Sequence, residues 1–252
     1  MPATFTRHQV ETERKDTGYG GKPPLDRRPT GGGGGDDNWD SRPSGRRGPR
    51  ELLIRYRLAV LSGLAGDFVF FAVLVSAFFV RQTSGHIDAS DMYITDWHPL
   101  AAPPILWVNT AILLLSTVTI EIARRQLFHE IDIMEEWLGL GRPAVRRAAP
   151  WLVATILLGI AFLAGQWIAW KQLATQGLFF STNPNSHFFY LVTGTHGVHL
   201  LLGVGALIFA LIAIFRLKRV ELRQIAVDCT AWYWHAMSLF WGFLFVLIVF
   251  FQ

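Results

Sequence analysis

The 252-residue sequence is rich in apolar side chains and poor in charge: hydrophobic residues make up 51% and charged residues 17%, although residues 1–50 are almost wholly polar. A soluble domain carries about a quarter charged residues, so the rest of this chain is too apolar for one. The single cysteine, Cys229, excludes a disulfide framework and a cysteine-based zinc or iron–sulfur site. The net charge of +4 does not indicate a nucleic-acid partner, because Lys and Arg flank apolar runs. The composition predicts a multi-spanning membrane protein.

Residues 1–50 form a compositional block that we interpret as a polar, Gly/Pro-rich tail. The block contains the run Gly31–Gly35 and charges of both signs, and it has no apolar segment like that of a signal peptide. Such a segment buries too little apolar surface to offset its conformational entropy. We therefore expect a disordered or partner-ordered tail, followed by a membrane domain over residues 51–252.

Five apolar runs follow the tail, and each is long enough to cross a hydrocarbon core of about 30 Å as a helix. A β-barrel would instead show short alternating segments. The predicted fold is an all-α integral membrane protein with five transmembrane helices. The predicted spans lie near residues 58–80, 101–123, 148–170, 187–215 and 230–251.

The positions of the basic residues predict the orientation of these spans. If the spans alternate in direction, all but two of the 23 Lys and Arg residues fall on the side of the tail. The two exceptions are Arg81 and Lys171. Loops rich in Lys and Arg stay in the cytoplasm, so we expect a cytoplasmic N-terminus and an external C-terminus.

Asp67 is a carboxylate in the middle of the first predicted span, ahead of Phe68-Val69-Phe70-Phe71. An acid that faced lipid there would cost several kcal/mol by some estimates. It should therefore face another helix, a lipid headgroup or a water-filled cleft. Two interpretations stay open: proton handling or headgroup contact, and hydrogen-bonded packing between helices.

His196 and His199 lie three residues apart on one predicted helix, so both imidazoles should lie on a similar face. Two such side chains can ligate a metal or haem, but a site needs more ligands, and His235 is the only other obvious histidine within a span. Hydrogen bonding between helices is the favoured interpretation. Gly194 and Gly197 support it, because small residues let helices approach closely.

Three further features lie near the ends of spans. Aromatic residues with polar tips, which begin at Trp232, open the fifth span and are typical of a membrane anchor. Glu121 and Arg125 are spaced for a local ion pair of small net value. Arg216 follows the fourth span, where cations attract anionic phospholipid.

Three motifs occur in order on the second, fourth and fifth predicted spans. They are Pro104-x-x-x-x-Asn109-Thr110-x-x-Leu113-x-x-Ser116, then Phe188-Phe189 followed by Thr193-Gly194-x-His196-Gly197-x-His199, and finally Trp232-Tyr233-Trp234-His235 with Trp241. Together they resemble subunit III of the haem–copper oxidases, the cytochrome c oxidase subunit III family. The resemblance covers about residues 52–252, and it matches the five-helix form found in bacteria.

The resemblance implies a non-catalytic subunit of a respiratory terminal oxidase, a complex that reduces O2 to water and pumps protons. Haem and copper would lie in the partner subunits I and II, so no catalytic, cofactor-binding or metal-binding residue is expected in this chain. The subunit would stabilise subunit I, hold phospholipid in a cleft, offer O2 a route through lipid and support proton uptake. In the family, the positions of Asp67 and Arg216 are associated with that lipid, and the remaining signature residues serve helix packing. We expect a multi-pass protein of the bacterial inner membrane, whose tail is a candidate contact for another respiratory complex.

The packing positions named by the resemblance are Asn109, Thr110, Ser116, Glu121, Thr193, Gly194, His196, Gly197, His199, Trp232, Trp234 and His235. Three positions depart from the family pattern: Ala169 and Ser238 stand where the family has acids, and Asp67 stands where it usually has Glu. Alternatives are the equivalent subunit of a quinol oxidase or nitric oxide reductase, a stand-alone channel or transporter, and a lone haem protein using the three histidines named above.

Overall fold

The computed structural model describes residues 49–83, 85–87, 93–95, 97, 102–129, 133–134, 138–139, 141–181 and 183–251. All of them belong to one compact unit, Gly48–Gln252. The predicted tail lies outside the described residues, apart from its last two.

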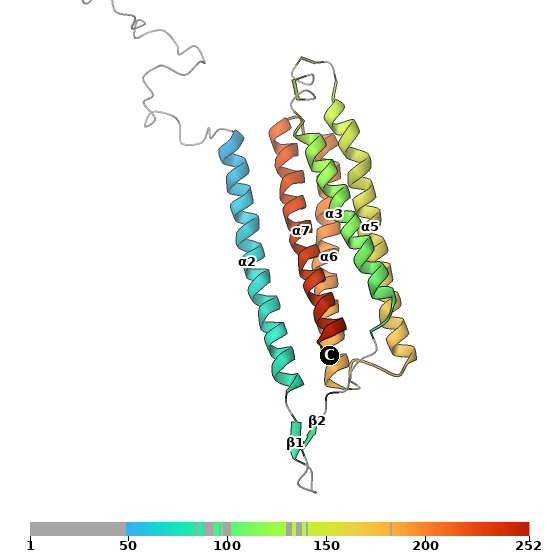
Figure 1. Cartoon of the computed structure of the whole chain (residues 1–252). Helices are drawn as coiled ribbons and strands as arrows, with labels where there is room; N and C mark the ends of the chain where they lie inside the picture. Colours follow the sequence, from blue (N-terminus) through green and yellow to red (C-terminus); the bar gives the residue numbers. More distant parts are fainter. Residues whose placement is uncertain are drawn as a thin grey trace, which may run out of the picture. The chain divides into compact units, whose positions relative to one another are not determined.

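Five long helices form the described part of the chain. They are α2 (Pro49–Gln82), α3 (Ile105–Leu127), α5 (Pro143–Thr175), α6 (Pro184–Arg216) and α7 (Val220–Phe250). Each is long and apolar enough to cross a membrane, which confirms the five predicted spans. The last four form a bundle, and α2 stands beside it, in contact with α7 and α6 (Figure 1).

The helices extend beyond the predicted spans, because an apolar run marks only the part of a helix that lies in hydrocarbon. The largest difference is at α7, which begins at Val220 although the predicted span begins at residue 230. The predicted 216–229 loop is therefore mostly helix, and residues 217–219 alone connect α6 to α7. At α3 the helix begins later than predicted, at Ile105, directly after Pro103 and Pro104.

A short hairpin that the sequence analysis did not predict lies between α2 and α3. Its strands, β1 (Gly85–Ile87) and β2 (Tyr93–Thr95), pair antiparallel. Strands this short leave no recognisable alternation in the sequence. The hairpin is followed by Trp97, which is buried edge-on against Phe78 with ring centroids 5.0 Å apart.

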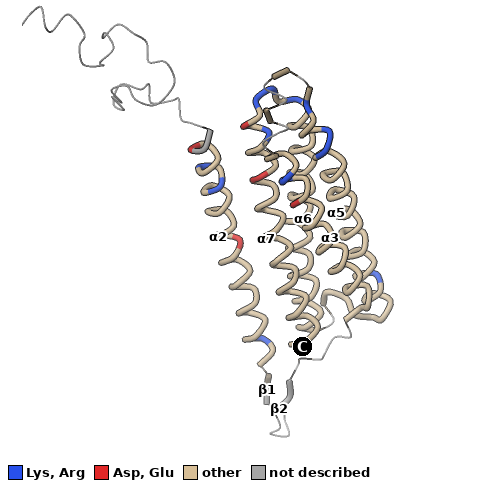
Figure 2. Tube along the Cα trace, turned by 45° about the horizontal axis from the view of Figure 1, so that its top comes forward, with Lys and Arg blue, Asp and Glu red and all other residues tan. Residues whose placement is uncertain are grey.

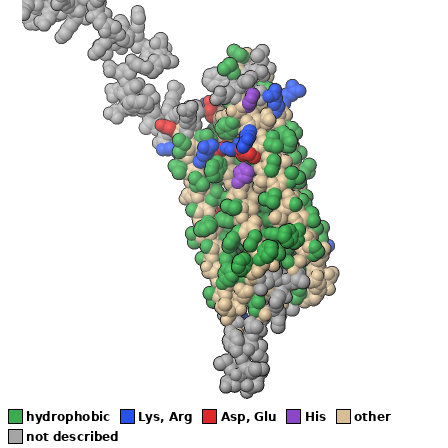
Figure 3. Space-filling model, in the orientation of Figure 1, with side chains coloured by type: hydrophobic (Ala, Val, Ile, Leu, Met, Phe, Trp, Pro, Cys, Tyr) green, Lys and Arg blue, Asp and Glu red, His purple; other side chains and the backbone are tan. Residues whose placement is uncertain are grey.

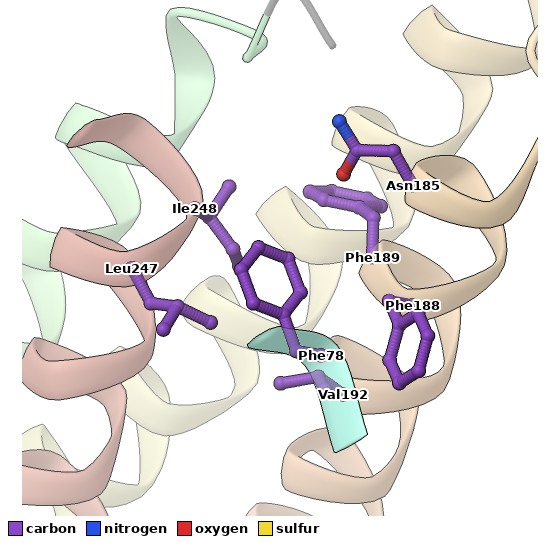
Figure 4. Close-up of a pocket in the computed structure, with 7 residues that line it drawn as sticks. All are labelled: Phe78, Asn185, Phe188, Phe189, Val192, Leu247 and Ile248. Carbon is purple, nitrogen blue, oxygen red and sulfur yellow. The ribbon is translucent and has the colours of Figure 1, made fainter. Parts of the chain in front are cut away.

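Phe78 also fixes this end of α2 to the bundle. Its ring points between α6 and α7, where the surrounding side chains leave a cavity of only about 10 Å³ (Figure 4). The lining residues are Phe78, Asn185, Phe188, Phe189, Val192, Leu247 and Ile248. Packing this tight indicates a structural contact.

Two glycines of α5 allow the closest helix approaches in the bundle. A Cβ atom on Gly165 would lie 1.9 Å from Oδ1 of Asn109, and one on Gly159 would lie 2.7 Å from the Trp234 ring. Gly194 and Gly197 of α6, where the sequence predicts a close helix approach, have more space around them. A Cβ on Gly194 would meet Trp170 at an ordinary 3.6 Å, and one on Gly197 would meet no atom within 4 Å. Gly194 therefore lies at an ordinary packing distance from Trp170, whereas none of the described helices approaches Gly197 closely.

Charged residues gather at one end of the helices (Figure 2). We call this the basic end; it comprises the first turns of α2, α5 and α7 and the last turns of α3 and α6. On the face shown in Figure 3, hydrophobic side chains are spread over the surface below this end, and charged side chains gather at the end itself. The opposite end, where β1 and β2 lie, is called the hairpin end. The predicted orientation would put the basic end in the cytoplasm.

Candidate functional site

A charge cluster joins three helices near the basic end. At its centre is Asp228 of α7, whose carboxylate is completely buried. Arg57 of α2 donates to it through Nε at 2.6 Å and through Nη2 at 2.9 Å. Arg124 of α3 donates to the same carboxylate through Nη1 at 3.1 Å. Two cations thus compensate one buried acid, and one of these contacts is the bidentate kind that fixes geometry as well as charge.

Glu121 extends this cluster along α3. It accepts two hydrogen bonds from Arg124, at 2.9 and 3.0 Å, and one from Arg125 at 2.8 Å. The structure thus contains the local pair with Arg125 that the spacing suggested. His235 of α7 brings Nε2 to within 3.6 Å of the same carboxylate. Glu121 therefore belongs to a network that spans helices.

Asp67 faces α6 instead of lipid alone. Its Oδ1 lies 3.4 Å from Nε2 of His199, and both side chains are partly exposed, at 27% and 19%. The other ring nitrogen of His199 lies 2.8 Å from the carbonyl oxygen of Thr195, one turn earlier in α6. Phe71 packs against the same imidazole, with ring centroids 5.5 Å apart. This arrangement gives the intramembrane acid a polar neighbour but leaves it accessible from outside the protein.

His196 differs from the expectation that it would hydrogen-bond between helices. The side chain is completely buried, and neither ring nitrogen has a hydrogen-bond partner among the described residues. Its ring lies between Phe71, Phe162 and Trp241, with centroids 6.4, 6.1 and 5.3 Å away. The imidazole is therefore held by aromatic packing.

Two amide side chains in the same layer of the bundle are also buried without hydrogen-bond partners among the described residues. Asn109 on α3 and Gln166 on α5 are buried, and their side-chain oxygens and nitrogens likewise have no partner among the described residues. Asn109 contacts the backbone at Gly165, and Phe162, one turn from Gln166, contacts His196. The polar groups thus come from three helices at one level.

Three buried or half-buried tryptophans tie the signature motifs together. Each indole nitrogen donates to the hydroxyl of a signature residue on another helix. The pairs are Trp234 to Ser116 at 2.9 Å, Trp241 to Thr110 at 3.0 Å, and Trp170 to Thr193 at 3.1 Å. A buried indole needs such an acceptor, so these residues hold the bundle together.

The aromatic stretch at the start of the fifth predicted span divides among four surroundings. Trp232 is 42% exposed, as expected of a membrane anchor, whereas Trp234 is completely buried in the core. Tyr233 donates to the backbone oxygen of His199 at 2.9 Å. His235 approaches Glu121, as described above. One helical turn of α7 therefore presents side chains to the outer surface, to α6, to α3 and to the core.

Arg216 is the candidate that the structure does not bring to the site. It is exposed at the last residue of α6. His199, which meets Asp67, lies 17 positions earlier on the same helix, or about 25 Å away at 1.5 Å per residue. Asp67 and Arg216 therefore do not share one headgroup-sized site.

Arg57 and Asp228, which form the contact between α2 and α7, are not among the residues that the sequence singles out. Asp228 lies two residues before the predicted fifth span, in a predicted loop. Arg57 is one of many basic residues that precede the first predicted span. The one sequence signal for this contact is that Asp228 is an acid within an otherwise apolar segment. Its pairing with Arg57 leaves no local pattern, because 171 positions separate the two residues.

The described residues contain no group of three or more His, Cys, Asp or Glu side chains placed to hold a metal ion. The three histidines of the haem alternative have different surroundings: an aromatic enclosure for His196, Asp67 for His199 and Glu121 for His235. The geometry thus favours charge pairing and packing over metal ligation.

Comparison with known proteins accounts for the motif pattern. The sequence pattern of cytochrome c oxidase subunit III matches residues 52–252. The chain is 30% identical over 204 residues to a probable cytochrome c oxidase subunit 3 of Rickettsia conorii, covering 73% of this chain and 63% of that relative's length. It is 30% identical over 189 residues to cytochrome c oxidase subunit 3 of Corynebacterium diphtheriae, covering 75% of this chain and 84% of the relative. A third relative, from Rhipicephalus sanguineus, is 27% identical over 199 residues, covering 75% of this chain and 68% of its own length. With its five apolar helices and its motifs in place, the chain belongs to the cytochrome c oxidase subunit III family.

Proposed function

We propose that the chain is subunit III of a respiratory haem–copper terminal oxidase of the cytochrome c oxidase type. The observation that carries this proposal is the family match over the whole described membrane domain. In this role the chain is a non-catalytic part of an oxidoreductase that reduces O2 to water and pumps protons. Haem and copper lie in the partner subunits I and II, and the location is the bacterial inner membrane.

The contacts described above support a structural role for the signature residues. Three tryptophan–hydroxyl pairs and the cluster around Asp228 hold the five helices together, so the fold offers subunit I a stable surface. Apolar side chains cover much of the outer surface, as packing against another membrane subunit or lipid requires.

Asp67 is the residue through which the chain would act on lipid and protons. It is a partly exposed acid beside a histidine, at a depth where water is scarce. We infer that it borders a phospholipid-filled space between α2 and the bundle. O2 partitions into hydrocarbon because it is apolar, so the same space would carry O2 toward subunit I. Arg216 would contact headgroups separately, at the basic end.

Purification of the tagged full-length chain tests the proposal. In mild detergent we expect oxidase subunits I and II to co-purify by mass spectrometry, with haem bands in a reduced-minus-oxidised spectrum. The haem type and the accompanying subunits separate a cytochrome c oxidase from a quinol oxidase or nitric oxide reductase. A colourless chain without oxidase partners, obtained after crosslinking in intact membranes, would overturn the proposal and favour a stand-alone channel or transporter.

A further inference from the structure

An open pocket of about 300 Å³ lies at the hairpin end, between α5 and the start of α6. It is remote from the cluster around Asp228, and no residue of α2 lines it. Five aromatic side chains and one cation form most of its wall: Trp167, Trp170, Phe179, Phe180, Tyr190 and Lys171. The functional site described above uses none of these side chains except Trp170.

Local hydrogen bonds hold the walls of this pocket in place. Gly177 has a φ of +75°, a left-handed conformation that ends α5 and turns the chain back. The backbone nitrogen of Leu178 then donates to the carbonyl oxygen of Leu173 at 3.1 Å. The Tyr190 hydroxyl donates to the Leu178 carbonyl at 2.9 Å. Phe179 and Phe180 are therefore presented next to α5 by a closed turn fixed to α6.

The charge of the pocket selects the sign of its ligand. Lys171 is exposed, and its Nζ lies 5.8 Å from the centroid of the Trp167 ring. It is the only charged group in the lining, and none of the ion pairs found among the described residues involves it. An aromatic cage alone would attract an ammonium or choline headgroup. Here the lysine already lies over an aromatic face and repels a second cation, so an anion is favoured.

The position of the pocket selects a lipid over a free anion. Lys171 lies four residues before the end of α5 at Thr175, at the level where phospholipid headgroups meet a membrane-spanning helix. Trp167 and Phe179 are 58% and 56% exposed, and they offer apolar surface to which an inorganic anion has no affinity. Glycerol and the first carbons of an acyl chain match that surface.

We propose that this pocket binds the headgroup of an anionic phospholipid. The phosphate lies at Nζ of Lys171, and the glycerol and upper acyl carbons lie against Trp167 and Phe179. The site would face the leaflet opposite the basic end, which the predicted orientation makes the outer leaflet. It is separate from the space proposed beside Asp67 and does not depend on the oxidase assignment.

Photocrosslinking in intact membranes tests the site with the full chain in its natural surroundings. A benzophenone amino acid replaces Phe179 in the pocket, and in a control chain it replaces Phe209, a 65% exposed residue of α6 outside the pocket. We expect the probe at position 179 to form adducts enriched several-fold in phosphatidylglycerol over its share of the membrane. The probe at position 209 should label lipids in proportion to their abundance.

Charge variants then show whether Lys171 selects the lipid. Lys171→Gln should abolish the enrichment at position 179, whereas Arg81→Gln, the matched loss of charge at the same end, should leave it intact. Adducts with another protein chain, or enrichment that survives Lys171→Gln, would overturn the proposal. Loss of the enrichment on adding millimolar inorganic phosphate would also overturn it, because it would identify a free-anion site. A haem spectrum of the same membranes reports separately on the oxidase assignment.

Discussion

Arg57 of α2 donates two hydrogen bonds to the buried carboxylate of Asp228 on α7, although 171 positions separate them in the sequence. Because α2 contacts only α7 and α6 to any extent among the described helices, this pair is the main polar attachment of α2 at the basic end. Arg124 makes the third contact to the same acid. Removing one partner of such a group leaves an uncompensated charge, which costs about 3–5 kcal/mol.

We therefore expect Asp228→Ala to destabilise the protein by about 3–5 kcal/mol, because Arg57 then faces Arg124 without the acid that lies between them, and Arg124 keeps only Glu121. Arg57→Gln should cost less, since Arg124 still compensates Asp228. Arg125→Gln is the control: its side chain is 78% exposed, and an exposed pair contributes about 0–1 kcal/mol. Thermal unfolding of the purified complex measures all three. An Asp228→Ala variant as stable as Arg125→Gln would contradict the role of the cluster.

The indole–hydroxyl pairs make a second prediction. Ser116→Ala leaves the Trp234 indole nitrogen buried without an acceptor, so we expect a loss of about 1–3 kcal/mol. Thr117→Ala, at the next position, removes a hydroxyl whose one partner among the described residues is the Leu114 carbonyl of its own helix. It should cost much less. Equal melting temperatures for the two variants would show that the indole contact is unimportant.

Close packing at Gly165 makes a third prediction. Gly165→Ala places a methyl group 1.9 Å from Oδ1 of Asn109, so we expect a loss of about 1–3 kcal/mol from overpacking. Gly205→Ala, where a Cβ meets no atom within 4 Å, should be neutral or stabilising, because alanine favours helix.

Shortening Asn109 tests the cause of that loss. The three atoms nearest to a Cβ at position 165 belong to the Asn109 side chain. The double variant Gly165→Ala with Asn109→Ala should therefore recover most of the lost melting temperature. If the double variant is no more stable than Gly165→Ala, the clash does not lie between these two residues.

Substitution of His196 should not lower the stability of the protein, in contrast to the substitutions above. The buried imidazole, which has no hydrogen-bond partner within the part of the chain that the structure describes, carries an uncompensated desolvation cost. His196→Leu, which keeps an apolar group of comparable size among three aromatic rings, should leave the melting temperature unchanged or raise it. A loss of more than about 2 kcal/mol would contradict this and point to a bonded imidazole.

Asp67→Ala tests the proposed role in lipid retention. Because α2 is also held by Arg57 and Phe78, we expect the complex to assemble. Bound phospholipid and the lifetime of the oxidase during turnover should change. Lipid mass spectrometry and the decay of O2 consumption measure these effects, and His199→Leu should reproduce them if the pair acts together. If neither lipid content nor activity decay changes in Asp67→Ala, the lipid proposal fails.

The local parts of the structure follow from the sequence, and the long-range contacts do not. Apolar runs predict five helices, and the i, i+4 spacing indicates the pair of Glu121 with Arg125. Apolar content measures the hydrocarbon thickness, so it misses the polar turns at the start of α7. Asp228 therefore lies outside the predicted fifth span, and its contact with Arg57 is not predicted.

The sequence also does not determine how each helix is rotated about its own axis in the bundle. The spacing of His196 and His199 places them on a similar face, yet one is completely buried and the other meets Asp67 at the edge of α6. The rotation of α6 about its own axis decides which of these surroundings each histidine meets. That rotation depends on how α2 and α7 pack on α6. The same rotation of α6 leaves Gly197 facing open space.

The pairing of α2 with α7 also bears on how the protein is made. Among the five described helices α2 is synthesised before the other four and α7 after them, so Arg57 has no Asp228 to bind until α7 has been made. The loop closure that joins them spans most of the membrane domain and is the most costly in entropy. The bundle can form around α3 and α5 meanwhile, since these neighbours in sequence contact each other extensively. The Arg57–Asp228 attachment of α2 can therefore form only after α7, the last of the described helices, has been made.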